Sequence, residues 1–235
     1  MKKRYERNML TLSKEENERL KDFRVCVVGC GGLGGHVIEQ LGRLGVGHLT
    51  AIDGDVFEES NLNRQILSDE SALGKSKAAA AKARMEKVNS DVNVRAVRAF
   101  LTAENSDELL KGHDVVVDAL DNIISRRVLE KGASDQNIPL VHGAIAGWYG
   151  QVSVILPGTR AFDALYPEKA GENAERGIER EIGTPAFTPA AVASIQVAEI
   201  LKLLLNRGSG LAGRLLTINL LDHEYELFEI GAERV

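Results

Sequence analysis

The sequence predicts an α/β fold with a doubly wound, mainly parallel sheet that is closed by antiparallel strands. An apolar run at residues 25–28 leads into the glycine-rich segment 29–35 and then into an amphipathic pattern, so a strand, a tight turn and a helix follow one another. Short apolar runs then alternate with helical patterns over residues 48–145, as in parallel βαβ units. Two alternating segments, 214–220 and 224–230, predict antiparallel strands at the end. Together these features indicate a Rossmann-like sheet.

Composition narrows the class of protein. The 235 residues are 44% hydrophobic, enough for one sizeable core, so we interpret residues 1–235 as a single domain with a helical N-terminal arm at 1–22. A net charge of −5 argues against a nucleic-acid partner held mainly by phosphate contacts. No apolar run approaches the about 20 residues of a membrane helix, and the N-terminus lacks the apolar stretch of a signal peptide. We therefore expect a cytoplasmic protein with no membrane partner.

The first strand, turn and helix predict a nucleotide site. Residues 13–21 form a short helix before them, because Ser13 is a suitable N-cap followed by acidic residues. A Cβ in the glycine turn would block both the turn and the approach of a phosphate, and the helix N-terminus then presents N–H groups to the anion. The next strand, 48–52, ends at Asp53, about 20 residues on, where a carboxylate takes the ribose hydroxyls.

The segment between this strand and the next helix is polar and irregular. Residues 54–65 read as a surface loop, yet they lie just past a strand tip, where open α/β sheets bind ligands. The following helix extends to Val88, and its lysines mostly form a solvated face. Lysines at its start, such as Lys77, are placed to reach a phosphate. Residues 93–97 predict a strand and 106–111 a short helix.

A second carboxylate lies at the tip of the buried strand at 113–120. Asp118 lies within this strand and suits a structural role, whereas Asp121 lies at the tip, on the same edge as the glycine turn. A carboxylate beside a nucleotide suits Mg²⁺, which prefers oxygen ligands. The alternative is that Asp121 caps the helix expected at 123–136, and the two roles can coexist.

The remaining elements complete the sheet and its cover. His142 lies in an apolar strand at 138–145, where a histidine is more often a core residue than a catalytic one. Another strand spans 151–157. Residues 160–184 are charged and lack periodicity, which predicts a crossover loop that is functional or mobile. Thr188 and the proline after it are expected to open a long core helix at 190–205.

The order of these blocks resembles the ThiF/MoeB/HesA family, relatives of the ubiquitin-activating enzymes. The resemblance runs from about Tyr5 to the end of the chain. The glycine motif alone is weak evidence, because many dehydrogenases carry one, but the amide-rich block after Asp-x-Asp is far more specific. The matching blocks are Gly29-Cys30-Gly31-Gly32-Leu33-Gly34, Asp53-Gly54-Asp55, Ser60-Asn61-Leu62-Asn63-Arg64-Gln65, Lys77, Asp121-Asn122 and Gln196-Val197-Ala198-Glu199.

The resemblance implies an adenylyltransferase that uses ATP and Mg²⁺. Members of this family activate the C-terminal glycine carboxylate of a small ubiquitin-like sulfur-carrier protein, which yields an acyl-adenylate and pyrophosphate. The implied roles are nucleotide backing by Gly29, Gly31, Gly32 and Gly34, ribose binding by Asp53, triphosphate contacts by Asn61, Arg64 and Lys77, and Mg²⁺ binding by Asp121. Further implied cofactor-binding residues are Asp55, Ser60, Asn63 and Asn122. Arg7 resembles an arginine that enters the site from the partner subunit of a homodimer.

The physical chemistry agrees with these roles. A carboxylate that attacks an α-phosphate approaches a polyanion, so the protein must screen charge and hold the attack in line. Two arginines, a lysine and a metal suit that task. No side-chain base is needed, because the nucleophile is already ionised.

The chain departs from many relatives in its cysteines. Where the family often has the first of two zinc-binding Cys-x-x-Cys pairs, this chain has Ala161 and Ala164, and no second pair exists, so we expect no zinc. Residues 160–184 also lack a cysteine for a thioester. Cys26 and Cys30 lie in the first strand and turn, where we expect buried packing. The reaction is therefore expected to stop at the adenylate.

Other functions compete with this interpretation. The glycine motif and Asp53 also suit an NAD-dependent oxidoreductase, but the block 60–65, Lys77 and Asp121 would then have no role. A degenerate, nucleotide-binding dimeric scaffold is a second alternative, and a relative that acts on a peptide or a modified tRNA base is a third. Use of ATP and dependence on a carrier tail distinguish them.

Overall fold

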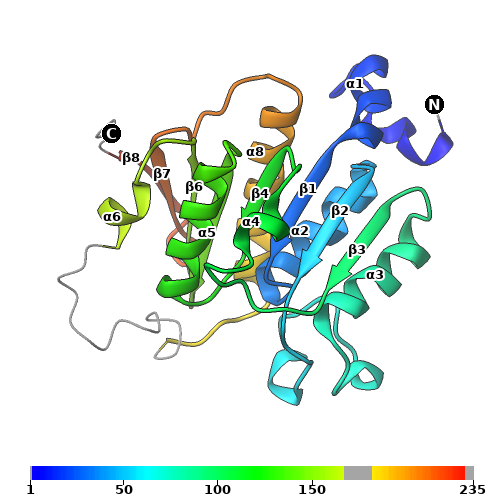
Figure 1. Ribbon diagram of the computed structural model, residues 1–235, viewed down its shortest axis with the longest axis horizontal. Helices are drawn as coiled ribbons and strands as arrows, with labels where there is room; N and C mark the ends of the chain where they lie inside the picture. Colours follow the sequence, from blue (N-terminus) through cyan, green and yellow to red (C-terminus); the bar gives the residue numbers. More distant parts are fainter. Residues whose placement is uncertain (1, 167–181, 231–235) are drawn as a thin grey trace.

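The computed structural model describes residues 2–166 and 182–230, and in this part of the chain eight strands form one sheet. Their spatial order is β3-β2-β1-β4-β5-β6-β7-β8 (Figure 1). The strands are β1 Arg24–Val28, β2 His48–Ile52, β3 Asn93–Val97, β4 Val115–Asp118, β5 Leu140–Ala146, β6 Tyr149–Ile155, β7 Arg214–Asn219 and β8 Glu224–Glu229. Neighbouring strands pair in parallel from β3 through β2, β1 and β4 to β5. The pairs β5–β6, β6–β7 and β7–β8 are antiparallel. The predicted fold class is confirmed.

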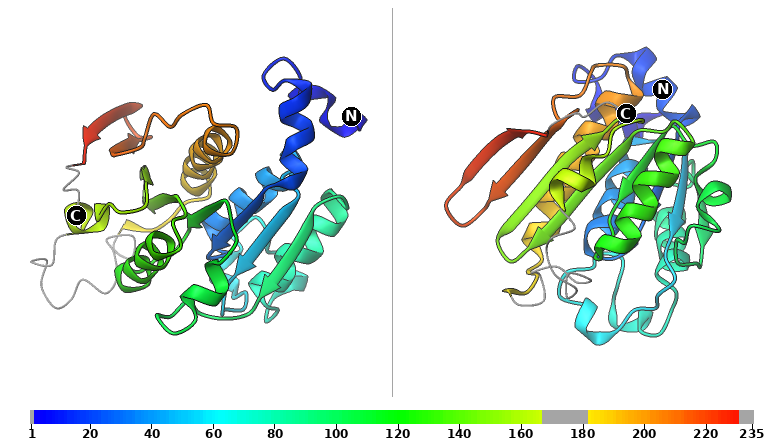
Figure 2. Two further views of the ribbon diagram at one scale, coloured as in Figure 1. Left: turned by 45° about the horizontal axis from the view of Figure 1, so that its top comes forward. Right: turned by 60° about the vertical axis from the view of Figure 1, so that its left-hand side comes forward.

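Helices cover both faces of this sheet, as Figure 2 shows for α5 on one face and for α2 and α8 on the other. The α-helices are α1 Lys14–Arg19, α2 Gly32–Leu44, α3 Lys77–Val88, α4 Ser106–Leu110, α5 Ile123–Asp135, α6 Ala161–Leu165 and α8 Phe187–Leu204. The 3₁₀ helices are η1 Lys3–Asn8, η2 Leu20–Asp22, η3 Glu59–Asn61 and η4 Glu70–Ala72. The arm, the first βα unit and the closing hairpin agree with the sequence analysis within a few residues.

Alternate residues of the buried strands feed two separate cores. Val25 and Val27 of β1 pack with α2, α3 and α8 in one core. Cys26 and Val28 face the other side and pack with α4, α5 and α6. A parallel strand between two helical layers is buried on both faces, which explains its continuous apolar run. Both cysteines are fully buried, and burial raises the pKa of the Cys26 thiol to about 12, so packing is their role, as expected.

The start of α8 differs from the prediction. The helix begins at Phe187, with Ala186 as its N-cap, so the expected cap at Thr188 is wrong. The Thr188 hydroxyl instead donates a 2.6 Å hydrogen bond to the carbonyl of Gly147. A buried threonine here satisfies a distant carbonyl in the β5–β6 turn and ties α8 to that turn.

Helix α8 meets the length and composition of a membrane span, although half of it is buried in this structure. It packs against α2 and against strands β4, β5 and β6. Its apolar surface packs against both α2 and the sheet, as expected of a core helix. The length and composition of α8 are therefore weak evidence for a membrane-spanning helix.

The predicted crossover loop at 160–184 is only partly described. Residues 161–165 form α6, a short helix that the sequence analysis did not predict. Its N-terminus is held by Glu130 of α5, whose carboxylate accepts the Phe162 N–H at 3.0 Å. Residues 167–181, most of the predicted crossover loop, lie outside the described residues.

Candidate functional site

A cavity of about 400 Å³ opens at the carboxyl edge of the parallel strands. The registers Val28–Ile52 and Val28–Asp118 bring the ends of β1, β2 and β4 to one edge, so the residues that follow these strands meet there. Nine predicted site residues line the cavity, namely Gly29, Gly31, Gly32, Asp53, Asp55, Arg64, Lys77, Asp121 and Asn122. Open α/β sheets bind ligands at this edge, where the strand order reverses.

The glycine turn depends on two close backbone approaches. Gly29 has φ of +96°, and a Cβ there would lie 2.4 Å from the carbonyl oxygen of Ala119. A Cβ on Gly34 would lie 1.8 Å from the carbonyl oxygen of Gly29. Gly34 therefore permits α2 to pack on the turn, and it does not line the cavity. Gly31 and Gly32 do line it.

Asp53 joins the turn to the loop after β2. Its Oδ2 accepts the Cys30 N–H at 2.7 Å, and its Oδ1 accepts the Asp55 N–H at 2.8 Å. The carboxylate thus keeps the two segments in register at the cavity wall. Asp55 in turn forms an ion pair with Lys77, with 3.4 Å between Nζ and Oδ2.

The amide-rich block, residues 60–65, holds the Arg64 side chain beside the cavity. The Arg64 Nη1 donates to the Ser60 carbonyl at 2.8 Å and to the Asn63 Oδ1 at 2.9 Å. Asn61 is buried, and its Oδ1 accepts the Glu58 N–H at 3.1 Å. Ser60, Asn61 and Asn63 therefore do not line the cavity in this structure and shape the loop that carries Arg64.

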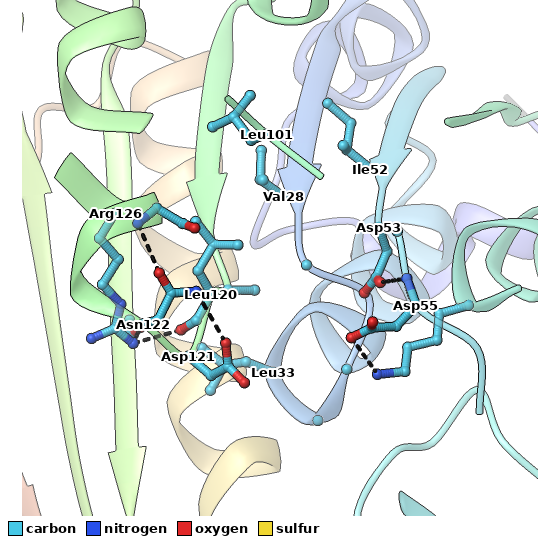
Figure 3. Close-up of a pocket in the computed structure, with 18 of the residues that line it drawn as sticks. Val28, Leu33, Ile52, Asp53, Asp55, Leu101, Leu120, Asp121, Asn122 and Arg126 are labelled. Atoms are coloured by element: carbon cyan, nitrogen blue, oxygen red, sulfur yellow. Dashed lines mark hydrogen bonds and ion pairs between the residues drawn. The ribbon is translucent and has the colours of Figure 1, made fainter. Parts of the chain in front are cut away.

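Asp121 projects from the tip of β4 towards Asp55, which lies across the pocket (Figure 3). It is not the N-cap of α5, as one alternative proposed. Asn122 caps the helix, because its Oδ1 accepts the Ser125 N–H at 2.8 Å. The exposed Asp121 carboxylate remains available for a hard cation, which commonly takes one or two protein carboxylates plus phosphate oxygens and water. The donor set therefore fits Mg²⁺.

One end of the cavity is apolar. Val28, Ile52 and Leu101 gather there, away from the carboxylates (Figure 3). Phe100 lies beside them, and a Cβ on Gly54 would lie 2.6 Å from its ring. An apolar slot beside Asp53, the carboxylate predicted to bind a ribose, suits a planar base. Phe100 and Leu101 were not among the predicted site residues, although both follow β3 and the position of β3 next to β2 was predictable.

Arg126 is a further residue that the sequence analysis missed. It is buried in the first turn of α5, four residues after the N-cap Asn122, and lines the cavity. Residues four apart lie on the same side of a helix, so a charged residue at this spacing from a strand tip was a usable signal.

A second groove continues from the cavity. Its volume is about 490 Å³, and it crosses one face of β5 to β8. The cavity and the groove share Asp121, Arg126, Ala144 and Ile145. The outer end of the groove includes Glu224 and Glu226. The two openings meet at the residue predicted to bind metal.

His142 is a core residue and lies behind the cavity wall. It and Asp118 are both fully buried, and the His142 Nδ1 lies 2.7 Å from the Asp118 Oδ2. Burial lowers the pKa of His142, which favours the neutral ring. The tautomer that donates from Nδ1 satisfies the Asp118 carboxylate. This agrees with the sequence interpretation.

Arg7 is the one predicted catalytic residue far from the cavity of its own chain. It lies exposed in η1, at the opposite end of the sheet from the strand tips (Figure 1). Its neighbours fix that position, since Tyr5 lies against Gly45 at the end of α2 and Arg4 hydrogen-bonds Asn89 after α3. Arg7 therefore does not reach the cavity of its own chain. It could contact this cavity only in a second copy of the chain.

Comparisons with known proteins agree with this geometry. A model of the ThiF family matches residues 5–234. The chain is 39% identical over 225 residues to the SAMP-activating enzyme E1 of Haloferax volcanii, covering 95% of this chain and 83% of that protein. It is 38% identical over 230 residues to the sulfur carrier protein adenylyltransferase of Thermus thermophilus, covering 94% and 84%. A crystal structure of E. coli MccB with MccA-N7isoASN shares the fold, with a TM-score of 0.86 at 22% identity over 100% of this chain and 74% of that one.

Proposed function

Because the chain belongs to the ThiF family, we propose that it adenylates the C-terminal glycine carboxylate of a small ubiquitin-like sulfur-carrier protein. The observation that carries this proposal is the junction of a nucleotide-sized cavity with a long groove at Asp121 and Arg126. Similarity to the sulfur carrier protein adenylyltransferase and to the SAMP-activating enzyme supports the substrate class. The reaction uses ATP and Mg²⁺ and ends at the acyl-adenylate, without a thioester cysteine of its own.

The cavity suits ATP in one orientation. The base enters the apolar end at Leu101, the ribose meets Asp53, and the phosphates run over Gly31 and Gly32 towards Lys77. Arg64 lies beside Gly32, where a Cβ would be 3.6 Å from the Arg64 Cγ, and is placed to meet these phosphates. Asp121 holds Mg²⁺, which neutralises phosphate charge when bound.

The groove suits an extended peptide tail. Residue pairing runs from Ala144 through Gln151 and Thr217 to Glu226, one residue on each of β5 to β8. Three strand spacings of about 4.8 Å give about 14 Å between the two ends. An extended chain covers about 3.3 Å per residue, so about four residues cross the groove. The last four or five residues of a carrier tail would lie there, with the terminal carboxylate at Asp121.

The chemistry needs charge control and no general base. The ionised carboxylate attacks the α-phosphorus, a new C–O–P linkage forms, the bond to the bridging oxygen breaks, and pyrophosphate leaves with its electron pair. Lys77 and Arg64 offset the negative charge that approaches and leaves. The walls of the groove hold the tail in line for attack.

ATP–pyrophosphate exchange tests this function. Small ubiquitin-like proteins from the same genome are assayed with Mg²⁺, each intact and with its last glycine removed. Exchange that requires the intact tail is the expected result. Tight ATP binding without exchange for any carrier would favour a nucleotide-binding scaffold. Binding of NAD in place of ATP would favour the alternative function, an NAD-dependent oxidoreductase.

Thr217→Trp is expected to block the tail and spare the nucleotide. Thr217 lies midway along the groove and does not line the cavity. We expect KM for the carrier to rise at least about tenfold, since an indole displaces the tail by ångströms, while ATP affinity in calorimetry stays unchanged. Arg214→Trp, at an exposed position of the same strand, is the control. A carrier KM that responds equally to both variants would contradict the groove assignment.

Arg7→Ala is expected to abolish most adenylation without separating the proposed homodimer. The reason is that Arg7 reaches a site only across a subunit interface. When Arg7→Ala and Asp121→Ala chains are mixed in equal amounts and exchange subunits, about half of the dimers contain one chain of each kind. One of the two sites in each mixed dimer is intact, so about a quarter of wild-type activity returns. Lys3→Ala, exposed in the same short helix, is the control. Full activity of Arg7→Ala, or no recovery on mixing, would contradict the cross-subunit role.

A further inference from the structure

Arg126 lies at the point where the cavity and the groove meet. It lines both, yet its side chain is only 9% exposed. A guanidinium in such a place can contact a ligand directly, or it can hold the protein groups that do. Its hydrogen bonds distinguish these two roles.

Arg126 and Asp118 together fix the residue that precedes Asp121. The Arg126 Nη2 donates to the carbonyl of Leu120 at 2.6 Å (Figure 3). The Asp118 Oδ1 accepts the Leu120 N–H at 2.9 Å. The two side chains also form an ion pair, with 3.5 Å between Nε and Oδ2. Both backbone polar groups of Leu120 are thus held by one buried charge pair.

The other side of the guanidinium is held from the groove. The Arg126 Nη1 donates to the Tyr166 hydroxyl at 2.8 Å, and this hydroxyl also accepts from the Gln151 Nε2 at 2.7 Å. The guanidinium carbon lies 5.6 Å from the centre of the Tyr166 ring. These contacts keep the guanidinium turned towards the Leu120 carbonyl.

The same contacts argue against a direct ligand role. To reach a phosphate or a tail carboxylate, the guanidinium would have to leave Asp118 and the Leu120 carbonyl, and a buried carboxylate that loses its cationic partner is costly. Since the backbone from Leu120 enters Asp121, and Asn122 caps α5 immediately afterwards, the backbone of Asp121 is held from both sides, which limits the directions its carboxylate can take.

We propose that Arg126 is a positioning residue for Asp121: it fixes the Leu120 carbonyl and thereby aims the Asp121 carboxylate at the metal of the nucleotide complex. The proposal rests on the function given above. Residues that orient a metal ligand typically change metal affinity 10- to 100-fold when they are replaced. A loss of metal affinity is therefore the specific signature, distinct from a loss of nucleotide or carrier binding.

The test compares Arg126→Gln and Arg126→Lys with Arg127→Gln. Arg127 is the matched control, because it belongs to the same helix and binds Asp163 and the Tyr166 carbonyl, each at 2.5 Å, but not Leu120. Mn²⁺ binding is measured by electron paramagnetic resonance with an ATP analogue that cannot be cleaved between the α- and β-phosphates. Circular dichroism and thermal unfolding report on the fold, and the Mg²⁺ dependence of exchange is measured alongside.

We expect Arg126→Gln to weaken Mn²⁺ binding about tenfold or more, with metal-free nucleotide affinity changed less than about twofold. Arg126→Lys recovers part of this, because an ammonium reaches the Leu120 carbonyl but lacks the fork that also reaches Tyr166. Arg127→Gln keeps wild-type Mn²⁺ affinity. If Arg126→Gln does not fold, Arg126→Lys decides, since its affinity is expected to fall about threefold or more.

Wild-type Mn²⁺ affinity in a folded Arg126 variant would overturn the proposal, and so would an equal loss in Arg127→Gln. A failure of the proposed function is distinguished by another measurement. In that case the wild-type chain gives no carrier-dependent ATP–pyrophosphate exchange, whatever the Mn²⁺ measurements show.

Discussion

Asp121→Ala is expected to abolish Mg²⁺-dependent ATP–pyrophosphate exchange while the chain stays folded. Asp121 is exposed at the strand tip, and its only described side-chain hydrogen bond comes from the Asn122 amide, at 3.4 Å. Its removal therefore costs little stability. A metal ion contributes several kcal/mol of charge stabilisation, so its loss slows the reaction by about 100-fold or more. Initial exchange rates across a Mg²⁺ titration measure the effect.

Asp135→Ala is the matched control for this variant. It removes an exposed carboxylate from the last turn of α5, where Asp135 pairs with Lys131 at 2.5 Å. Exposed pairs of this kind contribute little, so wild-type exchange is expected. If excess Mg²⁺ restores the full rate in Asp121→Ala, the carboxylate only assists binding. Normal activity at all Mg²⁺ concentrations would remove Asp121 from the mechanism.

Parallel strands made most of this fold predictable. A strand that is buried on both faces is largely apolar, and the run from Val25 to Val28 met that condition throughout, whereas the strand at His48 met it except at His48 and Thr50. A glycine turn after the first of them fixed its place in the sheet. Once the strand ends were known, the residues beyond them had to share one edge. The positions of Asp53 and Asp121 at the cavity follow from that reasoning.

The cap predicted at Thr188 and the alternative cap at Asp121 are both wrong, and both concern polar side chains with a choice of partner. Thr188 and Asp121 each stood next to a helix start, where capping is the local option. In the structure Thr188 binds the distant Gly147 carbonyl, and Asn122 takes the cap of α5. Local sequence cannot decide between a near acceptor and a distant one, because the distant one exists only after the sheet has formed.

The site showed the same limit. Strand-tip residues were predictable, and the spacing of Arg126 from the tip of β4 was a usable signal, whereas the burial of Arg126, the role of Tyr166 and the groove were not predictable. Arg126 is buried because Asp118, the Leu120 carbonyl and Tyr166 surround it, and Tyr166 comes from a segment 40 residues further along. The groove is formed by β5 to β8, whose register no local pattern reveals. Gly34 was predicted among the glycines that back the nucleotide, and in the structure it lies outside the cavity lining and permits α2 to pack on the turn.

Gly34→Ala is expected to cause a severe loss of both stability and ATP binding. A Cβ at this position would lie 1.8 Å from the Gly29 carbonyl oxygen and 2.8 Å from its carbon, both backbone atoms that cannot rotate away. Gly29 itself cannot retreat, because it lies against the Ala119 carbonyl. Helix α2 must therefore shift, which we expect to cost about 3 kcal/mol or more. For a chain of this size the melting temperature then falls by about 10 °C.

Gly32→Ala separates packing from binding. A Cβ there meets Pro189 at 3.5 Å, an ordinary contact, and Gly32 is the first residue of α2, where alanine is well tolerated. We expect it to unfold at or above the wild-type temperature, so any weaker ATP binding in this variant reports on the turn itself. Calorimetry and thermal unfolding of both variants provide the comparison. A Gly34→Ala chain that melts at the wild-type temperature would mean that α2 can move off the turn freely, and the rigid glycine contact would no longer explain the geometry of the cavity.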